Sequence, residues 1–177
     1  ARLHLDIPLN GELVTAKGEV TLRNNSLFIK PLDSTLKNLS GKFSFINGDL
    51  QSEPLTASWF NQPLNVDFST KEGAKAYQVA VNLNGNWQPA KTGVLPEAVN
   101  EALSGSVAWD GKVGIDLPYH AGATYNVELN GDLKNVSSHL PSPLAKPAGE
   151  PLAVNVKVDG NLNSFELTGQ AGADNHF

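Results

Sequence analysis

Histidine, serine and acidic side chains are the residues of this chain that could take part in catalysis or metal binding. Their spacing does not predict a reactive site. The four histidines are His4, His120, His139 and His176. They are far apart and lack the helical i, i+4 pairing that is typical of zinc sites. Ser138 and His139 are neighbours in a proline-rich segment, a spacing that does not by itself bring a nucleophile and a base into contact. Because the chain has no cysteine, thiolate chemistry is excluded as well.

Segments that bind calcium, phosphate or nucleic acid are also missing or incomplete. Residues 159–163 begin like a calcium loop, but Ser164 occupies the position of the turn glycine and Gln170 that of the bidentate glutamate. No glycine-rich loop follows a predicted strand and opens a helix, as a phosphate loop would. The net charge is -5, and scattered lysines and arginines give no basic stripe for a phosphate backbone. We therefore expect no metal, no cofactor, no nucleic-acid partner and no enzymatic activity.

The elements that would position any binding residues are strands, because apolar and polar side chains alternate along most of the chain. The alternation is clear in residues 64–69, 77–84, 125–130 and 154–159. A period of two sends alternate side chains to opposite faces of a strand. Strands buried on both faces would instead read as unbroken apolar runs. The pattern predicts a mainly antiparallel β-sheet with one apolar and one polar face.

Six short segments share an Asn-Gly or Asp-Gly pair that follows an apolar residue or Trp109. They are residues 9–13, 46–50, 83–87, 109–113, 129–133 and 158–162. Both dipeptides accept the positive φ of a tight hairpin turn. We therefore predict that these segments are hairpin corners, and that successive hairpins extend one sheet.

One segment has helical periodicity and raises the question of what covers the apolar face. In residues 95–103 the apolar side chains recur at the spacing of an amphipathic helix. Two turns of helix cover only a small part of a long sheet. The residues alone leave two arrangements open: a closed β-sandwich whose two sheets bury each other, or an extended, strongly curved sheet whose apolar groove is filled by an apolar ligand.

Two stretches resemble a known family. Residues 36–45 and 55–64, LKNLSGKFSF and LTASWFNQPL, resemble a repeating unit of a leucine, a strand, a small polar turn and a second strand. Residues 129–149 contain LPSPL followed by lysine, proline and glycine, which resembles a more specific proline segment. The matches together span residues 36–160. On these residues the chain resembles the AsmA-like family of bacterial envelope proteins, most closely its YhdP-type branch.

The resemblance implies a function and a location. It implies a fragment of a long periplasmic protein of the Gram-negative envelope, anchored in the inner membrane and reaching toward the outer membrane. Its sheet would be similar to that of bridge-like lipid transfer proteins, in which a groove carries phospholipid acyl chains while the headgroups stay in water. The implied partner is phospholipid, and the implied role is lipid transport that supports envelope integrity without catalysis. Under this interpretation residues 1–177 form a single continuous segment of the groove.

The resemblance implies functional residues that form an apolar face of the sheet and not a catalytic site. The candidate groove lining is Leu64, Val66, Phe68, Tyr77, Val79, Val81, Leu83, Tyr125, Val127, Leu129, Val154, Val156 and Val158. We expect some of these residues to pack on the helix at residues 95–103 and the others to line the groove.

The proline-rich segment 137–152 is predicted to belong to the sheet and not to link two domains. Strands of the same alternating type precede and follow it, and ordered loops of this length are more often functional than idle. Ser142 can begin a helical turn that Pro147 stops, which leaves Leu140 and Leu144 free to face the apolar side. We predict that this loop packs at the lip of the groove.

An interpretation from another class remains open at this stage. The chain would then be a structural or adhesive β module, or a carbohydrate-binding module that uses Trp59, Trp87 and Trp109 as stacking platforms. Trp87 and Trp109 fall within predicted corners, so a structural role in a turn is the simpler explanation for both.

Overall fold

The structure, a computed structural model, describes residues 2–6, 14–142, 144–172 and 175–176. Within these residues the chain is mainly β, with one large antiparallel sheet, a second sheet of two strands and one short α-helix. The elements are β1 (Arg2–Asp6), β2 (Thr15–Ile29), η1 (Lys30–Leu32), β3 (Ser34–Ile46), β4 (Asp49–Ser52), β5 (Leu55–Trp59), β6 (Gln62–Glu72), β7 (Ala76–Trp87), η2 (Pro89–Lys91), α1 (Glu97–Ala102), β8 (Leu103–Gly105), β9 (Val107–Pro118), β10 (Thr124–Asp132), η3 (Leu133–Asn135), β11 (Val136–Ser138), β12 (Ala153–Asn161), β13 (Phe165–Ala171) and β14 (Asn175–His176). The alternation of side chains predicted this fold class correctly.

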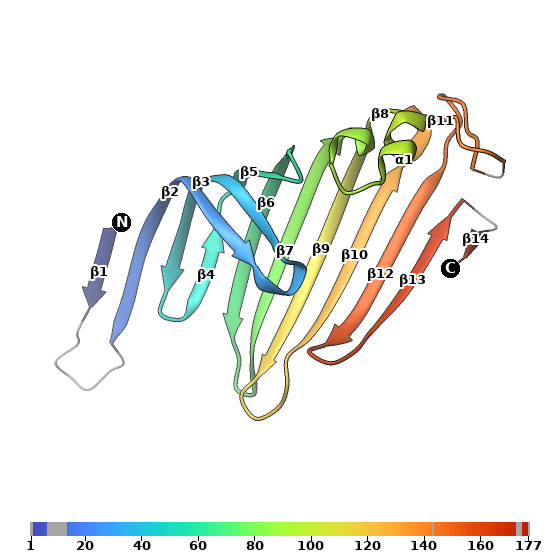
Figure 1. The fold of residues 1–177 in the computed structure, drawn as a ribbon. Coiled ribbons are helices and arrows are strands. Elements are labelled where there is room, and N and C mark those ends of the chain that lie inside the picture. Colours follow the sequence, from blue (N-terminus) through green and yellow to red (C-terminus); the bar gives the residue numbers. More distant parts are fainter. Residues whose placement is uncertain (1, 7–13, 143, 173–174, 177) are drawn as a thin grey trace.

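The large sheet extends in one direction as the chain proceeds (Figure 1). Its order is β1-β2-β3-β4-β6-β7-β9-β10-β12-β13-β14, with β5 paired to both β3 and β6. Two excursions interrupt this progression: η2, α1 and β8 lie between β7 and β9, and η3 and β11 lie between β10 and β12. Because β8 and β11 pair with each other, both excursions lie at the same end of the strands.

The pairing register of the strands places the apolar side chains on one face of the sheet. Between β7 and β9, Val81 stands opposite Val113, and the next residues, Asn82 and Lys112, stand opposite each other. Directly opposed residues of an antiparallel pair share a face of the sheet. The alternation within each strand therefore becomes an apolar face and a polar face of the whole sheet.

Most of the predicted hairpin corners lie inside strands. Of the segments that the structure describes, only residues 46–50 form a corner, where Asn47, with a φ of 53°, and Gly48 connect β3 to β4. The segments 83–87, 109–113, 129–133 and 158–162 lie wholly or largely within β7, β9, β10 and β12. The segment 9–13 lies outside the described residues.

The glycines of these misassigned segments serve packing across the sheet. A Cβ on Gly111 would stand 2.6 Å from Cδ2 of Leu129, and one on Gly85 would stand 2.7 Å from Nε1 of Trp87. Glycine inside a strand typically marks such a close approach. Neighbouring bulky side chains therefore require glycine at positions 85 and 111, and a turn is only one of the structures in which an Asn-Gly or Asp-Gly pair occurs.

The predicted helix is present but lies away from the middle of the apolar face. It forms α1 (Glu97–Ala102) and packs mainly against η2 and β8. Figure 1 shows it at the end of the strands. The main contacts of the helix are therefore not with the strands that carry the predicted lining residues. Another element covers part of the apolar face of those strands.

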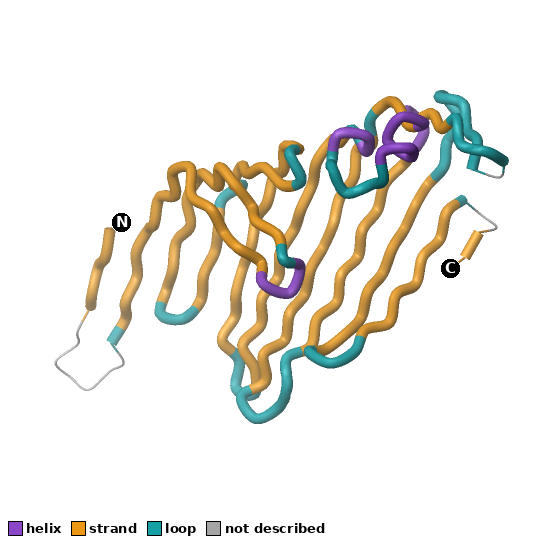
Figure 2. Tube along the Cα trace, viewed as in Figure 1, coloured by secondary structure: helices purple, strands orange, loops and turns teal. Residues whose placement is uncertain are grey.

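That element is the far half of the long β2–β3 hairpin, residues 25–39, which we call the arm. The near half of the hairpin belongs to the large sheet. One register shift, between Leu22 and Asn25, separates it from the arm, and a second follows between Asn25 and Leu27. Asn24 and Asn38 have positive φ values of 52° and 56°, a conformation that asparagine adopts more readily than most residues. The arm bends there and crosses in front of the sheet, ending in η1, which is purple in Figure 2.

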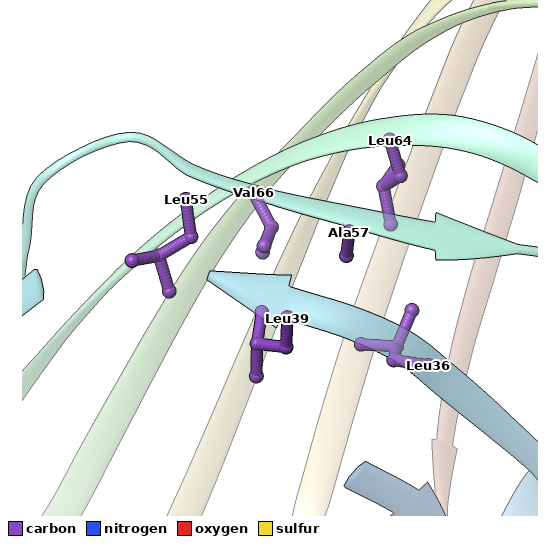
Figure 3. Packing of buried hydrophobic residues seen from close by; sticks show 6 residues of the cluster. All are labelled: Leu36, Leu39, Leu55, Ala57, Leu64 and Val66. Atoms are coloured by element: carbon purple, nitrogen blue, oxygen red, sulfur yellow. The ribbon is translucent and has the colours of Figure 1, made fainter. Parts of the chain in front are cut away.

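The buried core lies where the arm meets β5 and β6 (Figure 3). Its members are Leu36, Leu39, Leu55, Ala57, Leu64 and Val66. Val81 and Leu83 of β7 pack against this core and are partly buried. The arm covers only this part of the apolar face. Among the described residues no second sheet faces the rest, so the alternative of a closed β-sandwich is wrong.

The seam between β4 and β6 is held largely by side chains. These strands share one paired position. Nearby, Phe68 donates its backbone N–H to Oγ of Ser52 at 2.8 Å, and Leu50 donates its N–H to Oγ1 of Thr70 at 2.8 Å. Hydroxyl oxygens therefore satisfy backbone donors that a regular ladder would pair with carbonyls.

An exposed ion pair closes the end of the same seam. Asp49 accepts hydrogen bonds from Nζ of Lys71 at 2.7 Å and from the backbone N–H of Glu72 at 2.6 Å. The Lys71 ammonium and then the Glu72 N–H hold the pKa of the Asp49 carboxyl below its ordinary value.

Candidate functional site

The apolar face of the sheet carries a continuous row of hydrocarbon side chains across six strands. Each member stands directly opposite the next, from β6 to β13. The row consists of Phe68, Val81, Val113, Val127, Val158 and Leu167. A row of directly opposed residues lies on one face, so this central row presents hydrocarbon without a polar group from one strand to the next.

Glycines stand opposite large side chains in the rows on either side of the central row. In the row through β10 to β13, Tyr125 stands opposite Gly160, and Gly160 stands opposite Phe165. On the other side Gly111 stands opposite Leu129. Each glycine leaves space that a bulky neighbour occupies, because a Cβ in either position would lie within 3 Å of that neighbour. The face is therefore filled by large side chains lying over glycines.

Cover of this face decreases from β6 toward the C-terminal strands. Val66 is buried in the core, whereas Val113, Val127 and Val158 are only partly buried. Leu167, the last member of the central row, is 47% exposed. Monomeric soluble proteins seldom expose a contiguous apolar surface without a binding role. The uncovered part of the face, on β9 to β13, is therefore a candidate binding surface.

The opposite face of the same strands is polar and internally bonded. Asn155 donates its side-chain amide to Oδ1 of Asn130 at 2.7 Å, and Asn130 donates to Oδ2 of Asp110 at 3.2 Å. Lys157 lies 3.8 Å from Oε1 of Glu128 in an exposed ion pair. This face is suited to water, and the sheet therefore separates an apolar surface from an aqueous one.

The tryptophans form a cluster with one another at one end of the apolar face. Trp59 stacks on Phe60 with ring centroids 4.7 Å apart, and Trp87 meets Trp109 edge to face at 4.7 Å. Trp59 donates its Nε1–H to Oγ of Ser34 in the arm at 2.8 Å. Since the rings pack on each other and Trp59 holds the arm, a role as free platforms for carbohydrate is not supported.

The proline-rich loop lies with the two excursions at the end of the strands (Figure 1). Within the loop, the backbone N–H groups of Ser138 and Lys146 each donate a hydrogen bond to the carbonyl of the other residue. Nζ of Lys146 also donates to the carbonyl of Val136 at 3.0 Å. Leu140 is half-buried and Leu144 is exposed. The loop is thus an ordered part of the fold. Leu144 donates its backbone N–H to the carbonyl of Pro141 at 2.9 Å, and residues 148–149 form a further turn.

The structure places the predicted lining residues in two different surroundings. Leu64 and Val66 belong to the buried core, and Phe68, Val81 and Leu83 pack against it. The other predicted residues lie where the cover is partial: Tyr77, Val79, Tyr125, Val127, Leu129, Val154, Val156 and Val158.

The list of predicted lining residues omitted neighbours that complete the face. Val113 and Ile115 of β9 stand directly between β7 and β10 residues of the list. Phe165 and Leu167 of β13 continue the same rows. Alternation of apolar and polar residues marks all four, so the signal was present in the sequence.

The described residues contain neither a metal-binding constellation nor a membrane-spanning helix. In the parts of the chain that the structure describes, no group of three or more His, Asp or Glu side chains is placed to hold a metal ion. None of the helices described there is long and apolar enough to cross a membrane.

Comparison with known proteins identifies a relative of the whole chain. The family described as YhdP protein matches residues 1–177. The chain is 99% identical over 177 residues to the intermembrane phospholipid transporter YhdP of Escherichia coli strain K12. The match covers all of this chain and 14% of the length of that relative. No solved structure matches the chain.

Proposed function

The chain belongs to the YhdP family, as its resemblance to the YhdP-type branch predicted, and we propose that its apolar face carries phospholipid acyl chains as one segment of a longer track. The observation that carries the proposal is the central row, which offers hydrocarbon on six consecutive strands. The name of the E. coli relative describes an intermembrane phospholipid transporter, which supports lipid as the ligand.

In this proposal the segment carries lipid without catalysing a reaction. Each methylene group that leaves water for the face contributes about 0.8 kcal/mol. Neighbouring strands offer similar aliphatic surface, so an acyl chain gains nearly the same free energy at each of them. Movement from strand to strand then meets low barriers, whereas a single deep pocket would retain the lipid. The headgroup stays in water beyond the edges of the face.

The proposed setting is the periplasm, with residues 1–177 as one continuous part of a protein anchored in the inner membrane. The polar opposite face, with its bonded asparagines and its Lys157–Glu128 ion pair, suits an aqueous compartment. The track would connect the inner and outer membranes and so support envelope integrity.

The proline-rich loop forms the lip of the track in this proposal. It is held at the end of the strands by the pairing of β8 with β11. Leu144, which is exposed, and Leu140 would contact lipid that passes this edge. Changing both to serine should lower lipid crosslinking and transport, and equal transport in the double variant would remove the loop from the track.

A matched pair of positions tests the central claim. A photoreactive residue is placed at Val158 or at Asp159 of this segment within the full-length E. coli relative. Val158 lies in the central row, and Asp159 is its neighbour on the polar face. Illumination followed by mass spectrometry should detect phospholipid adducts at Val158 and not at Asp159. Adducts at neither position, or equally at both, would contradict the proposal and favour a structural or adhesive module.

A further inference from the structure

Several contacts hold the arm, residues 25–39, in one position over the apolar face. At its base, Ser40 Oγ accepts a hydrogen bond from the backbone N–H of Asn24 at 3.0 Å, and Asn25 Oδ1 accepts one from the N–H of Arg23 at 2.8 Å. Gly41 has a φ of 137° and lies against Leu55, because a Cβ there would stand 2.5 Å from its Cδ2. These contacts define a rigid elbow.

The far part of the arm is also fixed to the sheet. Leu36 and Leu39 enter the buried core, where Figure 3 shows them beside Leu64 and Val66. Lys37 of the arm is paired with Ser58 of β5. Together with the hydrogen bond from Trp59 to Ser34, these contacts hold the arm at several points along its length.

One apolar residue on the sheet-facing side of the arm is only half covered by protein. Leu27 stands directly opposite Leu36 in the arm hairpin, so both lie on the same face of it. Leu36 is buried, yet Leu27 is 51% exposed. Phe28, the next residue, lies on the other face of the arm opposite Thr35 and is 57% exposed. The arm therefore places a half-exposed hydrocarbon side chain on the side on which the apolar face lies.

We propose that the arm is a fixed second wall of the lipid track beside the buried core, where Phe68, Val81 and Leu83 are only partly buried, and that Leu27 contacts acyl chains that pass this point. The inference rests on the proposed function, since it places lipid on the apolar face. At β9 to β13 an acyl chain has the sheet on one side only. Beside the arm it has apolar surface on two sides, so the arm positions the acyl chains there.

The test uses two neighbouring residues of similar exposure that lie on opposite faces of the arm. A photoreactive residue is placed at Leu27, Phe28 or Val158 of this segment in the full-length E. coli relative. We expect phospholipid adducts at Leu27 and Val158, with a yield at Leu27 several-fold above that at Phe28. Adducts at Val158 with none at Leu27, or equal yields at Leu27 and Phe28, would overturn the arm proposal and leave the proposed function standing. Absence of adducts at Val158 would overturn both.

A disulfide tests whether the wall is fixed. Lys37→Cys with Ser58→Cys joins a directly opposed pair, whose Cα separation of about 4.5–5.5 Å suits a disulfide. Oxidised and reduced forms of the double variant should transport phospholipid at the same rate. Transport that is lost on oxidation and recovered on reduction would show that the arm must move, which contradicts a fixed wall.

Discussion

Tyr125 lies across Gly160 on the neighbouring strand, and a Cβ on Gly160 would stand 2.7 Å from the tyrosine hydroxyl oxygen and 2.8 Å from Cζ. The pair connects β10 and β12 on the apolar face. Gly160 is one of the glycines whose sequence context favours a turn, yet its φ is not in the left-handed region. Position 160 therefore requires glycine because a larger side chain would clash with Tyr125, and not because of its backbone conformation.

Replacement of Gly160 by alanine should destabilise the fold by about 1–3 kcal/mol, as overpacking of a filled site does. The new Cβ meets both the Tyr125 ring and, at 2.9 Å, Cβ of Phe165, so two strands must adjust. Urea unfolding of the 177-residue chain measures the change. Gly122→Ala is the matched control, because a Cβ there meets nothing within 4 Å. Equal stability of the two variants would contradict the space argument.

The free energy of unfolding should depend strongly on the small core beneath the arm. Leu64 is 2% exposed and is enclosed by residues of β3, β5 and β6. Leu64→Ala removes buried methyl groups and leaves a cavity, which costs about 2–5 kcal/mol. Thermal unfolding should show a clear loss for this variant. Leu162→Ala, at a turn residue that is 78% exposed, should change stability by about 0.5 kcal/mol or less; a comparable loss there would refute the assignment of the core.

Ser52 should matter more to stability than its size suggests. It is buried, and its Oγ is the acceptor for the backbone N–H of Phe68 at 2.8 Å. Ser52→Ala leaves that donor without its partner at the β4–β6 seam, which costs about 1–3 kcal/mol. Chemical denaturation compares it with Ser44→Ala, an exposed serine in β3 of the same sheet. If the two serine variants unfold at the same urea concentration, the hydroxyl does not hold the seam.

The fold class could be predicted from the sequence because alternation reports directly which face of a strand each residue occupies. The same signal marked Val81, Val127 and Val158 as residues of one face, and their register confirms it. The helix at residues 95–103 was also predictable from its own periodicity. Each of these features depends only on residues that are near one another in the sequence.

The arm and the positions of the glycines depend on residues that are distant in the sequence. Asn-Gly at residues 84–85 is compatible with a turn or with a strand, and Trp109 of the adjacent strand, together with Trp87, decides between them. Likewise, the bend at Asn24 and Asn38 is stabilised by Leu36 meeting β5 and β6. The conformational preferences of short segments carry no information about these long-range contacts. The sequence pattern therefore predicted hairpin corners that are absent, and it did not predict that the arm covers β6 and β7.

Acid should weaken the end of the β4–β6 seam through Asp49. Lys71 and the Glu72 N–H lower the pKa of Asp49 in the folded protein below the ordinary value of 3.8. A carboxyl with a lowered folded pKa stabilises the fold above its unfolded pKa, and this contribution is lost as the pH falls through the folded pKa. The effect should be small because the pair is exposed.

Asp49→Asn isolates this contribution. In urea titrations at a series of pH values below about 5, the unfolding midpoint of the native chain should fall more steeply with acid than that of the variant. Lys71→Gln, which removes the first of the two donors, should reduce the steepness in the same direction. Identical pH profiles for the native chain and Asp49→Asn would show that this carboxyl contributes nothing to acid sensitivity.

Transport should respond to charge on one face of β13 and not on the other. Leu167 ends the central row, and Thr168, its neighbour, lies on the polar face opposite Lys157. Both are exposed, so Leu167→Asp and Thr168→Asp should fold alike. A carboxylate at position 167 must lose water when an acyl chain passes, a desolvation that is strongly unfavourable without a partner. In the full-length E. coli relative, Leu167→Asp should therefore lower phospholipid transfer between inner- and outer-membrane vesicles several-fold, while Thr168→Asp should leave it unchanged. Equal transfer by both variants would place the route of the acyl chains away from β13.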